Sequence, residues 1–169
     1  LCGTNADLID VTSAAPGMSI LLEGNDGSDT LTGSNAVNYF FVTGTDTGVG
    51  KTFVAANLAA ALARRGQRVL VLDADLGLAN LDVVLNLYPK LTLHDVFTGH
   101  VALDDAILPA PGNFSVLLAG SGMLEYSRMT PEVRDQLLKV IDKVAPRYDH
   151  VILDTGAGIS DVVLYAVSL

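Results

Sequence analysis

The sequence predicts a three-layer α/β fold, in which helices cover both faces of a mostly parallel sheet. Two observations predict it. From residue 37 onward, short apolar runs alternate with segments of helical periodicity, which is the pattern of β-α-β units. In the same region, the glycine-rich segment Gly44–Thr52 stands between a predicted strand and a predicted helix. The fold therefore needs at least four strands, most of them parallel.

Four apolar runs have the length and composition of buried strands. They are Tyr39–Thr43, Arg68–Leu72, Phe114–Leu118 and His150–Asp154. Between the first two runs, residues 51–65 place Val54, Leu58 and Leu62 on one helical stripe, and Gly66 is a natural helix C-cap. Shorter helices are expected at Thr92–Thr98 and Leu103–Ile107, and another helix begins at Ser160–Leu169.

A longer helix is predicted before the last strand. Thr130 can cap its N-terminus, Pro131 suits its first position, and Pro146 follows its end. Its apolar residues recur with helical spacing, which predicts one core-facing side: Val133, Leu137, Val140, Ile141 and Val144.

Composition limits the classes of function. The chain has 169 residues, half of them apolar, without a long apolar run, so it is predicted to be a soluble globular protein with no membrane segment. A net charge of −9 argues against nucleic-acid partners. Cys2 is the single cysteine, and no basic segment precedes an apolar stretch at the start, so we expect a reducing, cytoplasmic location.

The first 36 residues differ from the rest. They contain no lysine or arginine and are rich in Gly, Ser and Asn, so we predict an acidic appendage at 1–36 before the main domain at 37–169. Leu8–Val11 and Met18–Leu22 are strand candidates within it.

The segment Gly44–Thr52 has the composition and context of a phosphate-binding loop (P-loop), although Thr45 stands where the general pattern has glycine. Its backbone N–H groups and the helix N-terminus attract phosphate oxygens, Lys51 reaches the β- and γ-phosphates, and the Thr52 hydroxyl binds Mg²⁺. The chain is thus predicted to have a P-loop NTPase fold that binds ATP and Mg²⁺. The predicted nucleotide contacts are Gly44, Thr47, Gly48, Val49, Gly50, Lys51, Thr52 and Phe53.

Three aspartates follow predicted strands. Asp73 and Asp75 stand at the end of the second run and Asp154 at the end of the fourth. Ligands of open parallel sheets bind beyond the carboxyl ends of the strands, so these acids should face the P-loop. We expect Asp154 to hold Mg²⁺ through water, Asp73 to belong to the metal shell, and Asp75 to orient the attacking water as a catalytic residue with Lys51.

The motifs RVLVLDADLGLANLDVVLNL, LTLHDVFTGHVALDDAI and YDHVILDTGAGISD resemble the MinD/ParA class of P-loop ATPases, and within it the flagellar-number regulators of the FlhG (FleN) type. The resemblance runs from about Lys51 to Leu169. It implies an ATPase that dimerises face to face when ATP is bound, with Asp75 and Asp154 in switch regions, acting in cell positioning or flagellar regulation. It also implies that the family's domain continues past Leu169, so the fold is expected to be truncated.

The P-loop departs from that class. Asp46 stands where the MinD-type loop has its signature lysine, which contacts nucleotide across the dimer. The segment YFFVTGTDTGVGKT is instead similar to dethiobiotin synthetase, although the lysine-proline motif of that enzyme is absent. Two alternatives therefore stay open: an ATP-dependent ligase of that type, and a non-catalytic nucleotide-binding fragment or chimera.

The segment Gly24–Gly33 resembles a single calcium-binding RTX repeat, but one copy lacks a partner, so we favour a polar turn.

A further expectation concerns Tyr39–Thr43, whose flanking strands in the resembled family come after Leu169. Because an unpaired apolar strand edge invites aggregation, we predict that Met18–Leu22 pairs with it, or that the edge mediates self-association.

Overall fold

The computed structural model describes residues 8–10, 19–23, 30–32, 38–43, 50–75, 80–120 and 130–155. The strands are β1 (Leu8–Asp10), β2 (Ser19–Glu23), β3 (Thr30–Thr32), β4 (Asn38–Thr43), β5 (Val69–Asp73), β6 (Ile107–Ala110), β7 (Phe114–Leu117) and β8 (His150–Asp154). The helices are α1 (Lys51–Arg64), α2 (Leu81–Leu85), α3 (Leu93–Phe97), α4 (Leu103–Ala106), α5 (Pro131–Val144) and the 3₁₀ turn η1 (Ala145–Arg147). The expected helix at Ser160–Leu169 lies outside the described residues.

The main sheet confirms the predicted α/β class. Among the described residues it has six strands in the order β2-β4-β8-β5-β7-β6, and every pairing is parallel except that of β6 with β7. Strand β6 corrects the sequence prediction, because Ile107 begins this strand instead of ending a helix. Its Pro109 is tolerated because β6 lies at the edge of the sheet, where a missing N–H breaks no ladder.

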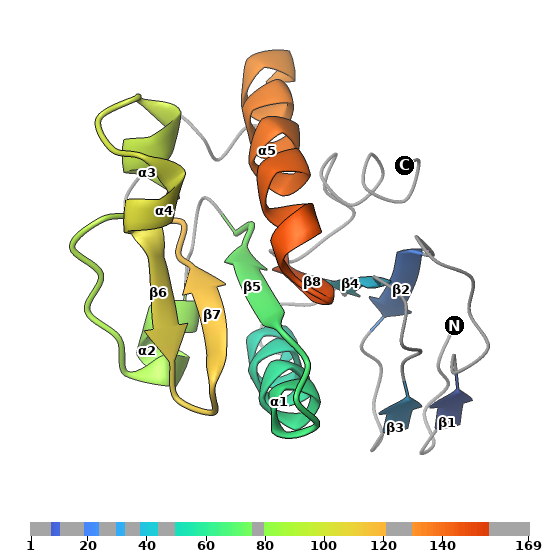
Figure 1. The fold of residues 1–169 in the computed structure, drawn as a ribbon. Coiled ribbons are helices and arrows are strands. Elements are labelled where there is room, and N and C mark those ends of the chain that lie inside the picture. The colour runs from blue at the N-terminus through green and yellow to red at the C-terminus, as the bar shows by residue number, and fades with distance from the viewer. Residues whose placement is uncertain are drawn as a thin grey trace.

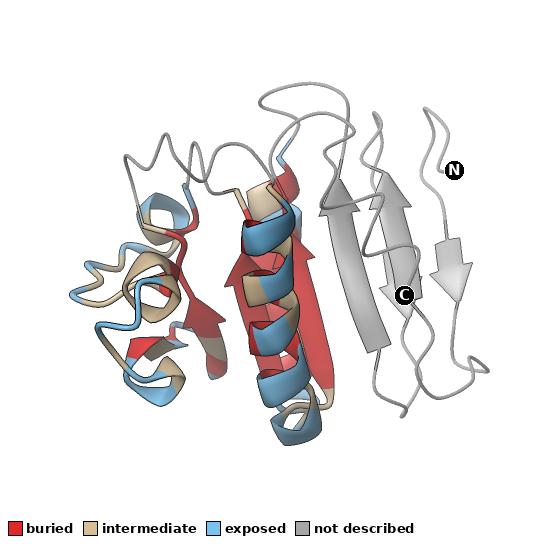
Figure 2. Cartoon of the chain, turned by 90° about the horizontal axis from the view of Figure 1, so that it is seen from above, coloured by how far each residue is buried: buried red, intermediate tan, exposed pale blue. Residues whose placement is uncertain are grey.

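Helices cover both faces of the sheet, as Figure 1 shows. On one side, α3, α4 and α5 pack with the side chains of Leu70, Leu72 and Leu153 in a first core. On the other side, α1 and α2 pack with those of Val71 and Ile152 in a second core. The alternation of neighbouring strand residues between the two cores follows from the two-residue period of a strand. Figure 2 shows the buried strands behind the exposed outer face of α5.

Helix α1 packs against the sheet through a face made mostly of alanine. Its buried face consists of Ala55, Ala56, Ala59, Leu62 and Ala63, together with Lys51 at its start. The stripe predicted from Val54, Leu58 and Leu62 is therefore wrong at Val54, whose side chain is exposed. Alanine side chains give the helix a flat face, and this face decides which side of α1 meets the strands.

Helix α5 confirms the sequence prediction in detail. The Thr130 hydroxyl accepts a hydrogen bond from the Val133 N–H at 3.4 Å, and Pro131 occupies the first turn. Its buried residues are the five predicted for the core face. The prediction succeeds here because the cap and the apolar periodicity are both local signals.

The edge of the P-loop strand is covered as predicted. Strand β2 pairs in parallel with β4 over its whole length, from Ser19 opposite Tyr39 to Glu23 opposite Thr43. The opposite side of β4 pairs with β8. A segment without resemblance to the P-loop ATPases thus extends their sheet by one strand.

Successive strands before β4 alternate between two sheets. Strand β1 pairs in parallel with β3, and β2 pairs in parallel with β4, so the chain winds between the small sheet and the main one. The polar-turn interpretation is wrong for Thr30–Thr32, which form β3. In this segment the tertiary pairing with Leu8–Asp10 supplies hydrogen bonds that a turn-rich composition does not predict. The division of the chain at residue 36 stays a prediction.

Candidate functional site

Of the predicted P-loop, the structure describes only the last residues, Gly50–Thr52, at the start of α1. Gly50 caps the helix with a left-handed backbone, at φ 80°, and its carbonyl accepts a hydrogen bond from the Val54 N–H at 2.9 Å. Lys51 follows as the first helical residue, and only 9% of it is exposed. The predicted nucleotide contacts Gly44, Thr47, Gly48 and Val49, and Asp46 with them, lie outside the described residues.

Two strand ends bring the predicted acids together. Strands β5 and β8 are neighbours, and Asp73 lies directly opposite Asp154 in their register. Beyond that pair, the Ala74 N–H donates to the Asp154 carbonyl at 2.8 Å, and the Asp75 N–H donates to Asp73 Oδ1 at 3.1 Å. The residues lie 81 positions apart in the sequence, and only the parallel sheet makes them neighbours, as the strand-end argument predicted.

The carboxyl group of Asp154 faces the start of α1. Its side chain accepts a hydrogen bond from the Thr52 hydroxyl. Burial raises the pKa of Asp154 to about 6, although the Thr52 hydrogen bond and the nearby charge of Lys51 both act to lower it. Thr52, Lys51 and Asp154 therefore belong to one site.

Asp73 is more deeply buried than either of the other acids, with 1% of it exposed. Burial and the neighbouring Asp154 raise the pKa of Asp73 well above its usual range, and the N–H groups of Asp75 and Ala119 only partly oppose this. Two buried carboxyl groups beside each other destabilise each other when both are charged. Such a pair is poised to bind a cation.

Magnesium fits the residues present. In the described part of the chain, Asp154 Oδ1 and Asp73 Oδ2 are buried without a hydrogen-bond partner. These carboxylate oxygens and the Thr52 hydroxyl are the hard oxygen donors that Mg²⁺ prefers. The ion would neutralise charge that burial makes costly, and the metal-ligand roles of Thr52, Asp73 and Asp154 stay predictions.

The raised pKa of Asp154 predicts a pH-dependent stability. The carboxyl group of Asp154 has an ordinary pKa of 3.8 and a pKa of about 6 in the folded protein. Between pH 6 and pH 3.8 it is therefore mostly protonated in the folded state and mostly ionised in the unfolded chain. Stability should therefore rise as pH falls through that window, by about 1 kcal/mol between pH 7 and pH 5 from this group alone. Urea unfolding of the nucleotide-free protein at pH 7, 6 and 5 measures it.

Asp154→Asn should reduce that pH dependence, because the amide does not titrate. Asp142→Asn, which changes an exposed carboxylate of α5, is the matched control and should leave the profile as in the wild type. A wild-type protein that loses stability steadily from pH 7 to pH 5 would contradict the environment described for Asp154.

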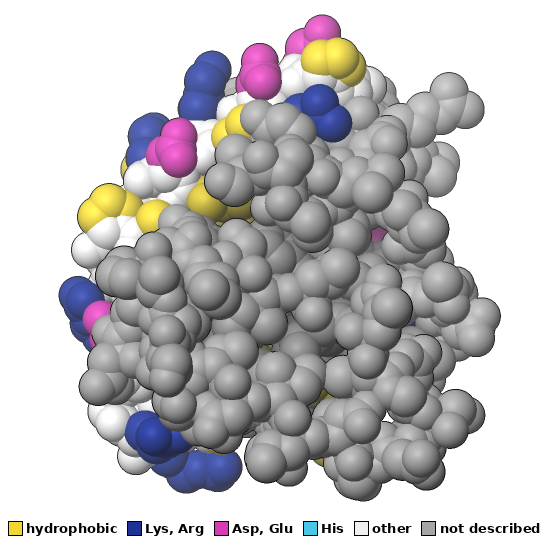
Figure 3. Space-filling view, turned by 90° about the vertical axis from the view of Figure 1, so that its right-hand side faces the viewer, with side chains coloured by type: hydrophobic (Ala, Val, Ile, Leu, Met, Phe, Trp, Pro, Cys, Tyr) yellow, Lys and Arg dark blue, Asp and Glu magenta, His cyan; other side chains and the backbone are white. Residues whose placement is uncertain are grey.

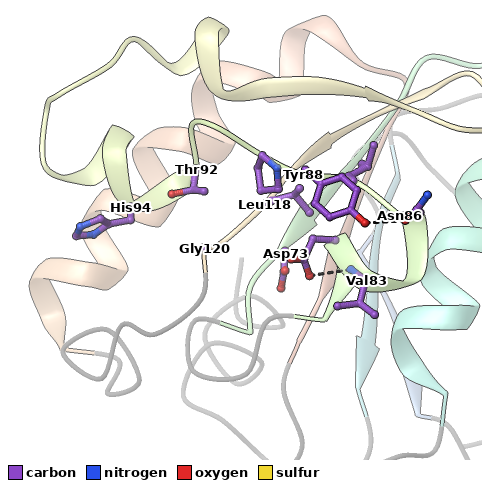
Figure 4. Close-up of a pocket in the computed structure, with 11 residues that line it drawn as sticks. Asp73, Val83, Asn86, Tyr88, Thr92, His94, Leu118 and Gly120 are labelled. Carbon is purple, nitrogen blue, oxygen red and sulfur yellow. Dashed lines mark hydrogen bonds between the residues drawn. The ribbon is translucent and has the colours of Figure 1, made fainter.

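A cavity adjoins this site that no sequence signal indicated. It has a volume of about 640 Å³ and Asp73 lies on its wall, as Figure 4 shows. Part of the wall depends on Gly120, since a Cβ there would lie 2.9 Å from the Thr92 hydroxyl. The cavity brings α2 and the segment after it together with the ends of β5 and β7, and only tertiary packing creates that arrangement.

A comparison with known families decides the identity of the domain. The CbiA profile, which describes the CobQ/CobB/MinD/ParA nucleotide-binding domain, matches residues 40–162. The chain belongs to this family. The MinD/ParA resemblance of the aspartate motifs is thereby confirmed.

Members of the CobQ/CobB/MinD/ParA family share both sequence and fold with this chain. The antiactivator FleN of Pseudomonas aeruginosa is 44% identical over 128 residues, which are 76% of this chain and 46% of FleN. The structure of the Pyrococcus horikoshii septum site-determining protein MinD with Mg-ADP is 32% identical, with a TM-score of 0.66 over 78% of this chain and 54% of that one. The chain spans about half the length of the curated relatives it matches.

A synthase also shares the fold of this chain. Cobyrinic acid a,c-diamide synthase of Mycobacterium smegmatis, solved with ADP and magnesium, is 25% identical, with a TM-score of 0.63 over 79% of this chain and 55% of that one. Two family structures thus hold ADP and magnesium, which supports nucleotide and magnesium binding in the family.

Two further predicted site residues, Asp75 and Phe53, are not fully buried. Asp75 is half-buried beside Asp73. Phe53 on the first turn of α1 is 64% exposed. Contact of its backbone with a nucleotide is compatible with this exposure, and the roles assigned to both residues stay predictions.

Proposed function

We propose that this domain binds ATP with Mg²⁺ and hydrolyses it slowly, as a nucleotide-dependent switch. The observation that carries the proposal is the Thr52–Asp154 hydrogen bond beside the buried Lys51 at the N-terminus of α1. A helix N-terminus, a lysine, a hydroxyl and a strand-end carboxylate together suit a metal-bound triphosphate.

Each group has a proposed task. The N-terminus of α1 and Lys51 attract the β- and γ-phosphates. Thr52 and Asp154 would hold Mg²⁺, with Asp73 in the metal shell, and the bound ion would neutralise phosphate charge. Asp75, next to this cluster, would orient the water that attacks the γ-phosphate. Slow turnover suits a switch, in which the lifetime of the ATP state carries the signal.

The similarity to FleN and MinD supports a cellular role in flagellar-number regulation or cell positioning. An ATP-dependent homodimer is part of this proposal. Asp46 at the signature-lysine position would weaken its contacts, because a carboxylate repels the phosphates that a lysine attracts.

Calorimetric titration with ATP, ADP and GTP, each with and without Mg²⁺, tests the proposal. Binding of ATP and ADP that strengthens with Mg²⁺ supports it. Absence of any nucleotide binding by the folded protein would leave only the non-catalytic scaffold interpretation.

The role of Asp75 predicts a separation of turnover from binding. Asp75→Ala should slow ATP hydrolysis at least tenfold, about 1.4 kcal/mol in the barrier, while ATP affinity changes less than threefold. Phosphate release under single-turnover conditions and calorimetry measure the two quantities. Asp142→Ala on α5 is the control, and equal losses of affinity and turnover in Asp75→Ala would remove the water-orienting role.

The loop sequence favours a second candidate, an ATP-dependent ligase of the dethiobiotin synthetase type. This enzyme would need diaminopelargonate and CO₂, whereas the switch needs no small substrate. Incubation of the protein with ATP, Mg²⁺ and both substrates distinguishes them. Dethiobiotin in the product mixture would reverse our ranking, and ATP hydrolysis without added substrate supports the switch.

We further propose a cytoplasmic protein without nucleic-acid partners. Among the described helices, none is long and apolar enough to cross a membrane.

On the face seen in Figure 3, the described lysine and arginine side chains are interspersed with acidic ones at its margin. With a net charge of −9, binding to a DNA duplex in a filter assay at low salt should be undetectable.

A further inference from the structure

The cavity beside Asp73 has the dimensions of a ligand site of its own. Its volume of about 640 Å³ lies within the range of about 300–1,000 Å³ that is usual for small-molecule pockets. It lies over the ends of β5 and β7, between α2 and the start of α3, whereas the Thr52–Asp154 pair lies over β8. Figure 4 shows Asp73 and Tyr88 on its walls.

Asp73 supplies an unsatisfied acceptor to this cavity. Its Oδ1 accepts the Asp75 N–H, and the Ala119 N–H also lies near the carboxyl group, but Oδ2 is buried without a hydrogen-bond partner among the residues that the structure describes. Only 1% of Asp73 is exposed. A buried carboxylate oxygen without a donor destabilises the protein, so a ligand that donates a hydrogen bond there would recover that cost.

The charge of the walls indicates which donor fits. Asp82 adds a second carboxylate, whose Oδ1 accepts the Val83 N–H at 2.8 Å. No lysine or arginine occurs among the described residues that line the cavity. His94 is the one basic side chain among these described lining residues, so acidic groups outnumber basic ones. Such a wall favours a positively charged ligand group over an anion.

The apolar part of the wall indicates what the charged group is attached to. Leu87, Tyr88 and Pro89 form one side of the cavity. The Tyr88 hydroxyl donates to Asn86 at 3.3 Å, and the residue is 87% exposed. An exposed aromatic ring beside acidic groups suits an aliphatic stem that ends in a cation, through apolar contact and cation–π attraction.

We propose that this cavity binds an alkyl ammonium or guanidinium group, with the cation at Asp73 Oδ2 and the alkyl stem against Leu87 and Tyr88. The proposal goes beyond the nucleotide switch and applies to the Mg²⁺-free protein, because Asp73 Oδ2 cannot accept the cationic group and contact a metal ion at the same time.

This chemistry has two possible sources, a small amine or a lysine or arginine side chain of a partner protein. Nucleotide-free and Mg²⁺-free protein is titrated with n-pentylamine and with N-acetyl-lysine methylamide, and binding is followed by amide NMR shifts. The uncharged matches are n-pentanol and N-acetyl-norleucine methylamide. We expect at least one cationic probe to bind tenfold or more tightly than its uncharged match, with shifts at Leu118 and Gly120. The free amine as the better probe indicates a small molecule, and the blocked lysine indicates a partner chain.

Three variants locate the site. Asp73→Asn should weaken binding of the cationic probe at least tenfold, and Tyr88→Ala should weaken it about threefold to tenfold. Asp142→Asn on α5 should leave it unchanged. Tyr88 is exposed and outside the proposed nucleotide site, so Tyr88→Ala should fold and bind ATP as the wild type does, which separates this proposal from the proposed ATPase.

Several results would overturn the proposal. The first is equal binding of the charged and uncharged probes. The second is absence of binding by both cationic probes at about 10 mM, which corresponds to a binding free energy weaker than about −3 kcal/mol. The third is an unchanged probe affinity in Tyr88→Ala. Displacement of the amine by Mg²⁺ alone, with Mg²⁺ binding lost in Asp73→Asn, would assign Oδ2 to the metal instead. If Asp73→Asn does not fold, the Tyr88→Ala titration decides alone.

Discussion

Lys51→Ala is expected to weaken ATP binding at least tenfold, about 1.4 kcal/mol. Lys51 is the first residue of α1, and it is 9% exposed beside Asp154. A buried ammonium at a helix N-terminus interacts with phosphate oxygens in surroundings where water screens charge poorly, and alanine removes this attraction completely. Calorimetric titration of both proteins with Mg-ATP measures the loss.

The matched control is Lys139→Ala, which removes an exposed lysine from α5. It should bind ATP as the wild type does. Urea unfolding of both variants shows whether they remain folded. Equal ATP affinities in the wild type and Lys51→Ala would remove Lys51, and with it the start of α1, from the nucleotide site.

The second large effect is expected in the core. Leu153→Ala should lower the free energy of unfolding by about 2–5 kcal/mol, the range for buried leucines that leave a cavity. Leu153 lies on β8 between β4 and β5, is 0% exposed, and packs in the core beneath α5. Urea unfolding followed by circular dichroism measures the change.

Val83→Ala is the control for that experiment. Its side chain is 74% exposed on α2, so its removal should change the free energy of unfolding by less than about 0.5 kcal/mol. A Leu153→Ala loss as small as the Val83→Ala loss would mean that β8 does not lie inside the sheet. Because Asp154 follows Leu153 on β8, that result would also remove the support for the site.

The sequence predicted α5 correctly and missed β6, and both results depend on whether the signals for an element are local in the sequence. The signals for α5 lie in neighbouring residues: a capping threonine, a proline in the first turn and a repeating apolar stripe. These local signals are sufficient to predict the helix. Strand β6 contains Pro109 and pairs antiparallel at the sheet edge with β7, so its existence depends on residues that a local pattern does not include. The same holds for β3, which becomes a strand through pairing with β1.

The candidate site divides in the same way. From the sequence alone came the P-loop, the three strand-end acids and the family, because these are motifs in which residue type and spacing carry the chemistry. Only the tertiary structure decided that Asp73 stands opposite Asp154, that Thr52 bonds Asp154, and that a cavity opens beside Asp73. Registers and cavities arise where distant segments meet, and no single segment encodes them. The sequence thus determined which groups are available for chemistry, and packing determined which of them act together.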